Sequence, residues 1–278
     1  MVSLRSRTRT RLVVLVPAQT QAPDTFSNPE IDPDGYDRLM AEMQRLRGSV
    51  YVRDGAVRRS DLTLDGRHRL AVDKKSWHVL SLDRDDNVCA CLRYVDETWA
   101  GGFDDLWIRN AAFSRVSALS HRFRRAVEVE MHTARRMGMR FGEVGGWAVA
   151  ENQRATFEPL RIILATYGLL RLLGGVRGVA TATFRHDSAP ILRRIGLNPL
   201  VGDGVELPSY FDPHYGCRME ALQFDSRYPA ARYEDWVGNL ADALRVAPAI
   251  CREPSESKVQ SVLARLELAH APEPVLSW

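Results

Sequence analysis

The stretch that decides the fold is Phe141-Gly-Glu-Val-Gly-Gly-Trp-Ala-Val149, the beginning of a block that runs on to Leu197. This apolar run predicts a buried strand, and residues 176–184 predict a second one. Residues 159–173, between the two runs, have the length and apolar content of a helix, and a short helix over 188–195 closes at Gly196. Strand, helix and strand in this order predict two neighbouring parallel strands joined by a right-handed crossover.

One charged residue, Glu143, lies in the first of these strands, two positions before the pair Gly145 and Gly146. A carboxylate in a buried strand is unusual, and glycines inside a strand indicate a β-bulge or a close backbone approach. We therefore expect the active site here, where the two strands part and expose unpaired backbone N–H groups. The alternatives are that Glu143 forms a structural ion pair with an arginine, and that the glycines make room for packing against Trp147.

Composition and charge limit the possible functions of the chain. Its 278 residues, of which 45% are apolar and 26% charged, are typical of a soluble protein with one large domain. A net charge of +3 is too small to indicate a nucleic-acid partner. No apolar run reaches the length of a membrane span, and residues 12–16 are too short for a secretory signal. We expect a cytoplasmic protein.

The four cysteines, at positions 89, 91, 217 and 251, match neither a zinc site nor a disulfide framework. We expect them to be free thiols, and we expect no metal.

The chain divides into a flexible basic extension over residues 1–33, a main domain over 34–250 and a tail over 251–278. Residues 12–16 in the extension predict a mobile tail or a single edge strand. In the main domain, a helix is expected from Asp34 to near Gly48, followed by Val50-Tyr51-Val52 and a long charged loop over 53–75. Further predicted elements are a β-hairpin over 77–95, helices over 115–137 and 233–246, and a strand over 217–224.

Arginines alternate with apolar residues along the helix predicted over 115–137. They predict either a solvated helix face or a docking surface for an acidic partner.

This order of elements resembles the GNAT acyltransferase superfamily, an α+β fold built as an α/β/α sandwich. Its mixed, mostly antiparallel sheet is splayed between two central parallel strands. Ser188-Ala-Pro-Ile-Leu-Arg-Arg-Ile-Gly-Leu197 resembles the closing helix of that superfamily. Glu143–Val149, Ala182-Thr183, Ser188-Ala189 and above all Tyr210-Phe-Asp-Pro-His-Tyr-Gly-Cys-Arg-Met-Glu-Ala-Leu-Gln-Phe-Asp-Ser226 resemble the N-acyl amino acid synthases, which are related in fold to the acyl-homoserine lactone synthases. The resemblance covers roughly residues 35–250.

Two positions depart from the superfamily pattern. Members that use CoA carry a glycine-rich loop whose backbone N–H groups bind the pyrophosphate, but Gln153-Arg-Ala-Thr-Phe-Glu158 contains no glycine. Many members carry a tyrosine as proton donor four residues before the closing glycine, where this chain has Leu192. Both departures argue against an enzyme that uses acetyl-CoA. They are compatible with a donor on a carrier protein, which offers one phosphopantetheine phosphate.

The resemblance implies an enzyme that transfers a fatty acyl group from an acyl carrier protein thioester to the amino group of an amino acid or a related small amine. No permanently bound cofactor is expected, because the acyl-phosphopantetheine or an acyl-CoA is itself a substrate. One alternative is a GNAT N-acyltransferase that uses acyl-CoA on another amine. The other alternative is a non-catalytic module that binds an acyl lipid or docks a partner.

Candidate site residues follow from this reading. The expected catalytic residues are Glu143 as general base, together with Gly145, Gly146 and Trp147. The expected donor-binding residues are Ala148, Val149, Arg154 for the phosphate, and Ser188. The acceptor is expected to contact Arg93 through its carboxylate, Asp73 through its ammonium group, and Tyr51. His78 and His186 are further candidates for the base.

Overall fold

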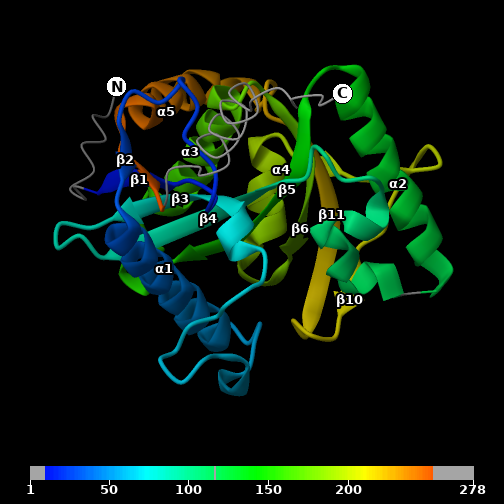
Figure 1. Cartoon of the computed structure of the whole chain (residues 1–278). Coiled ribbons are helices and arrows are strands. Elements are labelled where there is room, and N and C mark those ends of the chain that lie inside the picture. The colour runs from blue at the N-terminus through cyan, green and yellow to red at the C-terminus, as the bar shows by residue number, and fades with distance from the viewer. Residues whose placement is uncertain (1–9, 116, 253–278) are drawn as a thin grey trace, which may run out of the picture.

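The computed structural model describes residues 10–115 and 117–252 of the chain. Its centre is a ten-stranded mixed sheet in the order β10-β11-β6-β5-β4-β3-β1-β12-β2, with β7 paired to β11 (Figure 1). The strands of this sheet are β1 (Arg11–Leu15), β2 (Pro29–Ile31), β3 (Ser76–Leu82), β4 (Val88–Asp96), β5 (Arg140–Val149), β6 (Val176–Thr183), β7 (Asn198–Pro199), β10 (Tyr210–Asp212), β11 (Cys217–Asp225) and β12 (Ala249–Cys251). A separate hairpin consists of β8 (Val201–Gly202) and β9 (Val205–Glu206).

Helices cover both faces of the sheet, so the predicted α+β sandwich is confirmed. They are α1 (Pro33–Arg53), α2 (Ser117–Arg136), α3 (Glu158–Leu172), α4 (Ser188–Ile195) and α5 (Glu234–Val246). The helices α3, α4 and α5 pack on one face, around the largest apolar cluster. On the other face, α1 covers the half around β4 and α2 covers the half around β6, each over its own apolar cluster (Figure 1). The central strands are therefore left uncovered where these two helices separate.

The helix α1 is longer than the sequence predicted. It begins at the cap of Asp32, whose side chain accepts a hydrogen bond from the Gly35 N–H, and it continues through Gly48 to Arg53. Gly48 does not end the helix; a Cβ atom there would lie 2.6 Å from the carbonyl oxygen of Gly66, in the long loop that crosses the helix. The glycine is needed for this close approach, and the extra turn places Tyr51 on the helix.

The first strand corrects the prediction for the N-terminal extension. Residues 11–15 form neither a tail nor an edge strand, because β1 pairs with β3 on one side and with β12 on the other. Leu12, Val13, Val14 and Leu15 are all buried. A central strand is covered on both faces, which explains why its sequence is a continuous apolar run. Strands β1 and β2 of the extension and residue 251 at the end of β12 therefore take part in the central sheet.

The central parallel pair parts as predicted. Pairing of β5 with β6 covers only residues 140–143, opposite 176–179, and Glu143 is the last paired position of β5. Beyond it, β5 continues along β4, while β6 continues along β11. The register between β4 and β5 shifts here, so that Gly146 and Trp147 together lie opposite Leu92. This is a β-bulge, and Gly146 has a φ of 68°, in the left-handed region that favours glycine.

The central position of β1 predicts that Leu15→Ala costs about 2–5 kcal/mol in the free energy of unfolding, because Leu15 is fully buried. The matched control is Ile31→Ala on the edge strand β2, where the side chain is 62% exposed and the expected change is within about 0.5 kcal/mol. Urea unfolding measures both changes. Equal and small losses would contradict an interior position for β1.

Candidate functional site

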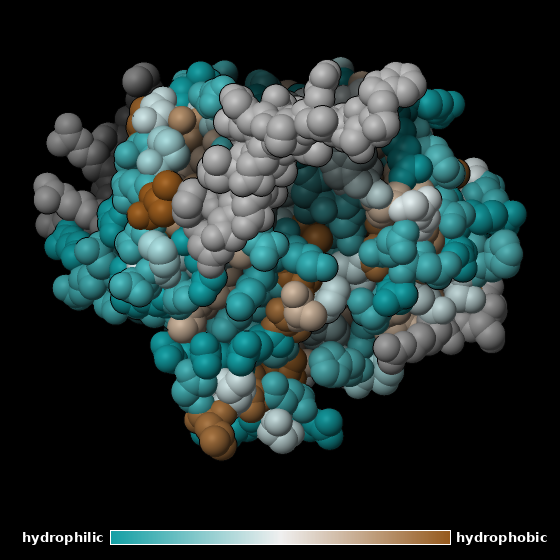
Figure 2. Space-filling view, in the orientation of Figure 1, coloured by the Kyte–Doolittle hydropathy of each residue, from teal (hydrophilic) through white to brown (hydrophobic). Residues whose placement is uncertain are grey.

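A cavity of about 840 Å³ occupies the place where the central strands part. Its lining residues come from both faces of the sheet. Thr181 and Met219 lie on the face that carries α1 and α2, whereas Pro159, Ser188 and Ile191 belong to α3 and α4 on the opposite face. The cavity therefore passes between the strands. Figure 2 shows that this side of the molecule is mostly hydrophilic, with hydrophobic residues visible at its centre, between the end of α1 and β10.

Glu143 and Arg93 form the charged part of the cavity lining. Glu143 Oε1 lies 3.6 Å from a terminal nitrogen of Arg93, and the two side chains are 8% and 4% exposed. Glu143 Oε2 and the Nε and one terminal nitrogen of Arg93 are buried without a hydrogen-bond partner among the described residues. A buried donor or acceptor without a partner costs free energy of folding. A polar ligand that forms hydrogen bonds with these atoms would recover part of that cost.

Burial controls the protonation of Glu143. The pKa of its carboxyl group is raised from 4.5 to about 8, chiefly because the carboxylate is removed from water. Arg93 opposes this rise, and nearby Glu97 adds to it. The pKa of Glu97 is itself raised to about 7 by burial, although the backbone N–H of Trp107 donates to its carboxylate. A group with a pKa near 8 can accept a proton at slightly alkaline pH, as a general base must.

The structure places Asp73 away from the cavity. Its carboxylate accepts hydrogen bonds from Arg47 at 2.9 and 2.7 Å and from Gln44 at 2.9 Å, and both charged side chains are almost completely buried. Burial alone would raise the pKa of Asp73, but Arg47 outweighs it and holds the pKa at about 2. Asp73 lies 4.0 Å from Arg93, so its position suits support of that arginine and not direct contact with an acceptor.

The two glycines of the bulge give access to the charged pair. A Cβ atom on Gly145 would lie 3.4 Å from both Arg93 and Glu143, on the side of the cavity. A Cβ atom on Gly146 would lie 3.3 Å from the Cβ of Arg93, in addition to the cost of its left-handed backbone. Trp147 follows, and its indole N–H is buried without a partner among the described residues. Side chains at the glycine positions would cover the pair that the bulge exposes.

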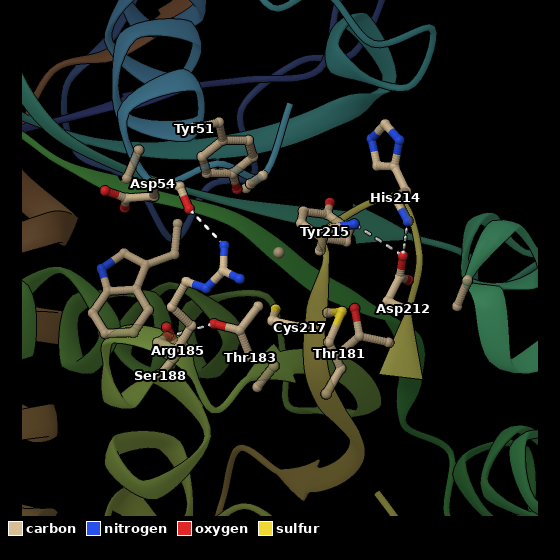
Figure 3. A pocket seen from close by; sticks show the side chains of 18 of the residues that line it. Tyr51, Asp54, Thr181, Thr183, Arg185, Ser188, Asp212, His214, Tyr215 and Cys217 are labelled. Carbon is tan, nitrogen blue, oxygen red and sulfur yellow. Dashed lines mark hydrogen bonds between the residues drawn. The ribbon is translucent and has the colours of Figure 1, made fainter. Parts of the chain in front are cut away.

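Cationic side chains lie at one rim of the cavity. Arg154 donates to the carboxylate of Asp54. Arg185 donates to the Asp54 carbonyl at 3.1 Å (Figure 3) and to the Gly216 carbonyl at 2.8 Å. His186 and Asp187 have φ values of 60° and 59°, an unusual pair of left-handed non-glycine residues just before α4. Such strain concentrates at functional sites, and here it places Ser188 at the rim.

Three tyrosines form an aromatic wall that the sequence did not identify as a unit. Tyr51 comes from α1, and Tyr210 and Tyr215 come from the hairpin between β10 and β11. Figure 3 shows Tyr51 and Tyr215 on these two elements, with Tyr215 between Tyr51 and Asp212. Burial raises the pKa of all three hydroxyl groups, so they remain protonated at neutral pH. The long motif 210–226 was a signal for this hairpin, but it did not show which side chains enter the cavity.

Cys217, in the cavity wall, and Cys91, which is not a lining residue, are both poor nucleophiles. Burial raises the pKa of Cys217, and it raises the pKa of Cys91, beside the Gly146 carbonyl, to about 12. All four cysteines are free, as predicted. Among the described residues, no group of three His, Cys, Asp or Glu side chains is arranged to hold a metal.

The structure brings most of the predicted site residues together. The cavity lining includes Glu143, Gly145, Gly146, Trp147, Ala148, Val149, Arg154, Ser188, Arg93 and Tyr51, but not Asp73. Of the two histidines, His186 lies at the rim, whereas His78 is buried behind the cavity with Nε2 at 2.9 Å from the Asp73 carbonyl oxygen. The arginines of α2 that the sequence suggested for docking have local partners, including Asp104, Asp203 and the Ala100 carbonyl. None of the described helices is long and apolar enough to cross a membrane.

Comparison with known proteins supports the fold. No protein-family model matches the sequence, and no curated protein matches it. A solved structure of BjaI, a CoA-dependent acyl-homoserine lactone synthase, with SAM and isopentyl-CoA is 12% identical, with a TM-score of 0.55 over 91% of this chain and 99% of that chain. The structure of BjaI with MTA is 13% identical, with the same TM-score and coverage. FeeM, an N-acyl amino acid synthase from uncultured soil microbes, is 12% identical, with a TM-score of 0.46 over 78% of this chain and 91% of that chain.

The likeness to BjaI shows a shared fold. The chain therefore has the fold of this acyl-homoserine lactone synthase, in agreement with the fold that its motifs predicted.

The raised pKa of Glu143 predicts a pH-dependent stability effect. The folded protein keeps this proton between pH 4.5 and about 8, whereas the unfolded chain releases it, so Glu143 makes unfolding progressively easier as pH rises through this window. Glu143→Gln removes the effect. We expect the melting temperature of the variant minus that of the wild type to increase from pH 5 to pH 8. Differential scanning calorimetry measures this difference. A constant difference across these pH values would show that Glu143 is already ionised in the folded protein.

Proposed function

We propose that the protein is an N-acyltransferase that moves a fatty acyl group from a thioester to the amino group of an amino acid or a related small amine. The single observation that carries this proposal is the cavity through the parted strands, with Glu143 and Arg93 in its wall and with atoms of both side chains lacking a hydrogen-bond partner among the described residues. Acyl transfer to an amine needs a deprotonated amine, a polarised carbonyl group and an aligned donor. The cavity offers a group for each of these requirements.

Glu143 acts as the general base. As a carboxylate it accepts a proton from the amine, directly or through a water molecule, while the nitrogen attacks the thioester carbonyl. Because the thiols of Cys91 and Cys217 remain protonated, the amine attacks the thioester directly and forms a tetrahedral intermediate without an acyl-enzyme.

The donor lies between the parted strands. From residue 144 onward, β5 no longer pairs with β6, which leaves backbone groups on that side of the strand, such as those of Val149, for the amides of a pantetheine. The bulge at Gly145 and Gly146 brings the backbone close to the thioester carbonyl and helps to stabilise its developing negative charge. The partnerless indole N–H of Trp147 is a further donor for this chain of amides.

The phosphate of the donor binds at the rim. Arg154 and Arg185 lie there with Ser188 at the first turn of α4, and a guanidinium group is well suited to phosphate. Both arginines already bind protein groups around Asp54, which leaves little free positive charge. A rim of this kind suits one phosphate better than the several phosphates of CoA. This supports an acyl carrier protein as donor, with acyl-CoA as the alternative.

The acceptor's carboxylate binds Arg93. This guanidinium group is buried, lines the cavity and keeps an unpartnered terminal nitrogen and Nε, and its neighbour Glu143 is protonated below pH 8. A bound carboxylate would accept a hydrogen bond from Nε and would place the α-amino group near Glu143. Tyr51 closes the same side of the cavity, and Asp73 supports Arg93 from behind.

The base predicts the pH dependence of catalysis. The wild-type kcat/KM should rise as pH passes through about 8, because Glu143 must lose its proton to act. Glu143→Gln should lower kcat/KM by about 100- to 10,000-fold and leave only the pH dependence that deprotonation of the amine itself imposes. The assay combines acyl carrier protein thioesters or acyl-CoAs with amino acids and detects products by mass spectrometry. Equal activity of the two proteins would contradict the role of Glu143. Saturable acyl-lipid binding without turnover would favour the non-catalytic alternative.

The role of Arg93 predicts a preference for acceptors with a carboxylate. Hydrogen bonds to charged groups contribute about 1.5–3 kcal/mol, so the wild type should favour an amino acid over its decarboxylated amine by about 10- to 150-fold in kcat/KM. Arg93→Gln should reduce this preference to a few-fold, mainly through a higher KM for the amino acid. The control is Arg122→Gln on α2, outside the cavity lining, which should keep the preference. An unchanged preference in Arg93→Gln would place the carboxylate elsewhere.

A further inference from the structure

The guanidinium group of Arg93 has an aromatic neighbour in the cavity wall, the indole ring of Trp107. The guanidinium carbon lies over this ring, 5.7 Å from the ring centre, and both residues line the cavity. An aromatic face attracts a cation electrostatically, most strongly where water is excluded. Unlike a carboxylate, the ring has no lone pairs that take up the N–H groups of the arginine. Trp107 therefore stabilises the buried cation of Arg93 and leaves its donors for the carboxylate of the acceptor.

The backbone on either side of Trp107 is anchored in the core. Trp107 begins the short helical turn Trp107–Asn110, in the segment between β4 and α2. Its two neighbours are almost completely buried, Leu106 being 1% and Ile108 2% exposed, and both belong to the apolar cluster beneath α2. The turn packs against β6 in this way. Trp107 itself is only partly buried and remains a lining residue of the cavity.

Glu97 supplies the polar anchor of the same turn. It directly follows β4, the strand that carries Arg93, and its backbone N–H donates to the Phe141 carbonyl on β5 at 2.9 Å. Its side chain is buried outside the cavity lining, and Oε1 accepts a hydrogen bond from the backbone N–H of Trp107. The first N–H groups of a helical turn have no acceptor within the turn, and the Glu97 carboxyl group provides one. Glu97 thus joins Trp107 to the two strands that carry Arg93 and Glu143.

A carboxyl group at position 97 is costly for the folded protein. Burial raises its pKa to about 7, and Asp96 adds to the rise, although the Trp107 N–H and Arg93 oppose it. Its Oε2 is buried without a hydrogen-bond partner among the described residues. An apolar side chain of similar size would fill the same space without either cost. Packing alone therefore does not account for Glu97, whereas its hydrogen bond to Trp107 does.

Resting on the proposed acyl transfer, we propose that Glu97 is a positioning residue for the acceptor site: through the N–H of Trp107 it holds the indole ring against Arg93. Trp107 then determines how well Arg93 binds the carboxylate of an amino acid. A guanidinium group that is held in place before binding loses less freedom when the carboxylate arrives. Glu97 touches neither substrate, so its effect reaches the acceptor only through Trp107. The consequence is tighter binding of acceptors that carry a carboxylate, with little effect on the chemical step.

The test measures the preference for a carboxylate in a competition between acceptors. The protein amino acids and their decarboxylated amines are mixed in equal amounts, with decanoyl thioesters of acyl carrier protein and of CoA as donors. Mass spectrometry gives the ratio of N-acyl amino acid to N-acyl amine. Trp107→Leu and Glu97→Leu should each lower this ratio about 10-fold. For the amino acid that the wild type uses best, KM should rise by this factor, and kcat should stay within about threefold.

Three controls separate this role from a general structural one. Glu97→Gln should keep the wild-type ratio within about threefold, because its amide oxygen accepts the same hydrogen bond from Trp107. Trp99→Leu, in the same segment, should leave the ratio unchanged, because the Trp99 side chain is 93% exposed. The double variant Glu97→Leu, Trp107→Leu should lose no more than Trp107→Leu alone, since Glu97 acts through that ring.

An unchanged ratio in Trp107→Leu or in a folded Glu97→Leu would overturn the proposal, and so would losses that add in the double variant. Equal losses with amino acids and amines would overturn it as well, because they would mean that the two residues only shape the cavity. If Glu97→Leu does not fold, the ratio in Trp107→Leu decides alone. A wild type that acylates both kinds of acceptor equally would refute this proposal and leave acyl transfer standing. A wild type that gives no product with either donor would refute both.

Discussion

The site depends on one constraint in the backbone, the left-handed conformation of Gly146. This residue gives β5 its bulge, three residues beyond Glu143, which is the last position of β5 that pairs with β6. Two consequences follow from the same geometry. The strands expose backbone that no neighbouring strand covers, and the absence of side chains at positions 145 and 146 uncovers Arg93 and Glu143. Access for the donor and exposure of the polar pair are therefore one structural feature.

The charges around Arg93 decide how costly it is to bury Arg93 and Glu143. Arg93 lies between Asp73, which is held ionised by Arg47, and Glu143, which burial keeps protonated below about pH 8. The group of four therefore carries one excess positive charge at neutral pH, and two nitrogens of Arg93, a residue of the cavity lining, have no hydrogen-bond partner among the described residues. A buried cation without a complete partner is costly unless a ligand supplies the missing charge. Binding of an anionic acceptor would relieve this cost and strengthen selection for it.

Much of the fold could be predicted because its signals are local. The parallel pair followed from two apolar runs around a helix, and Glu143 with its glycines stood out because a charge and two flexible residues are unusual in a buried strand. The predictions that were wrong concerned features that depend on contacts between distant parts of the chain. The glycine at position 48 does not mark a helix end; it allows the backbone of Gly66 to approach α1. The strand β1 is central because β12, at the far end of the main domain, pairs with it. The turn at Tyr215 and the pairing of Asp73 with Arg47 depend on contacts of the same kind.

The central claim is that an acyl donor lies between β5 and β6, and a crystal structure with a stable analogue tests it most directly. The analogue is an acyl-phosphopantetheine in which a methylene group replaces the sulfur, so that the thioester becomes a ketone. The account predicts that the pantetheine arm threads between the strands along Ala148 and Val149, with the ketone beside Gly145 and Gly146 and within reach of Glu143. An analogue bound outside the cavity, with β5 and β6 paired beyond residue 143, would contradict it.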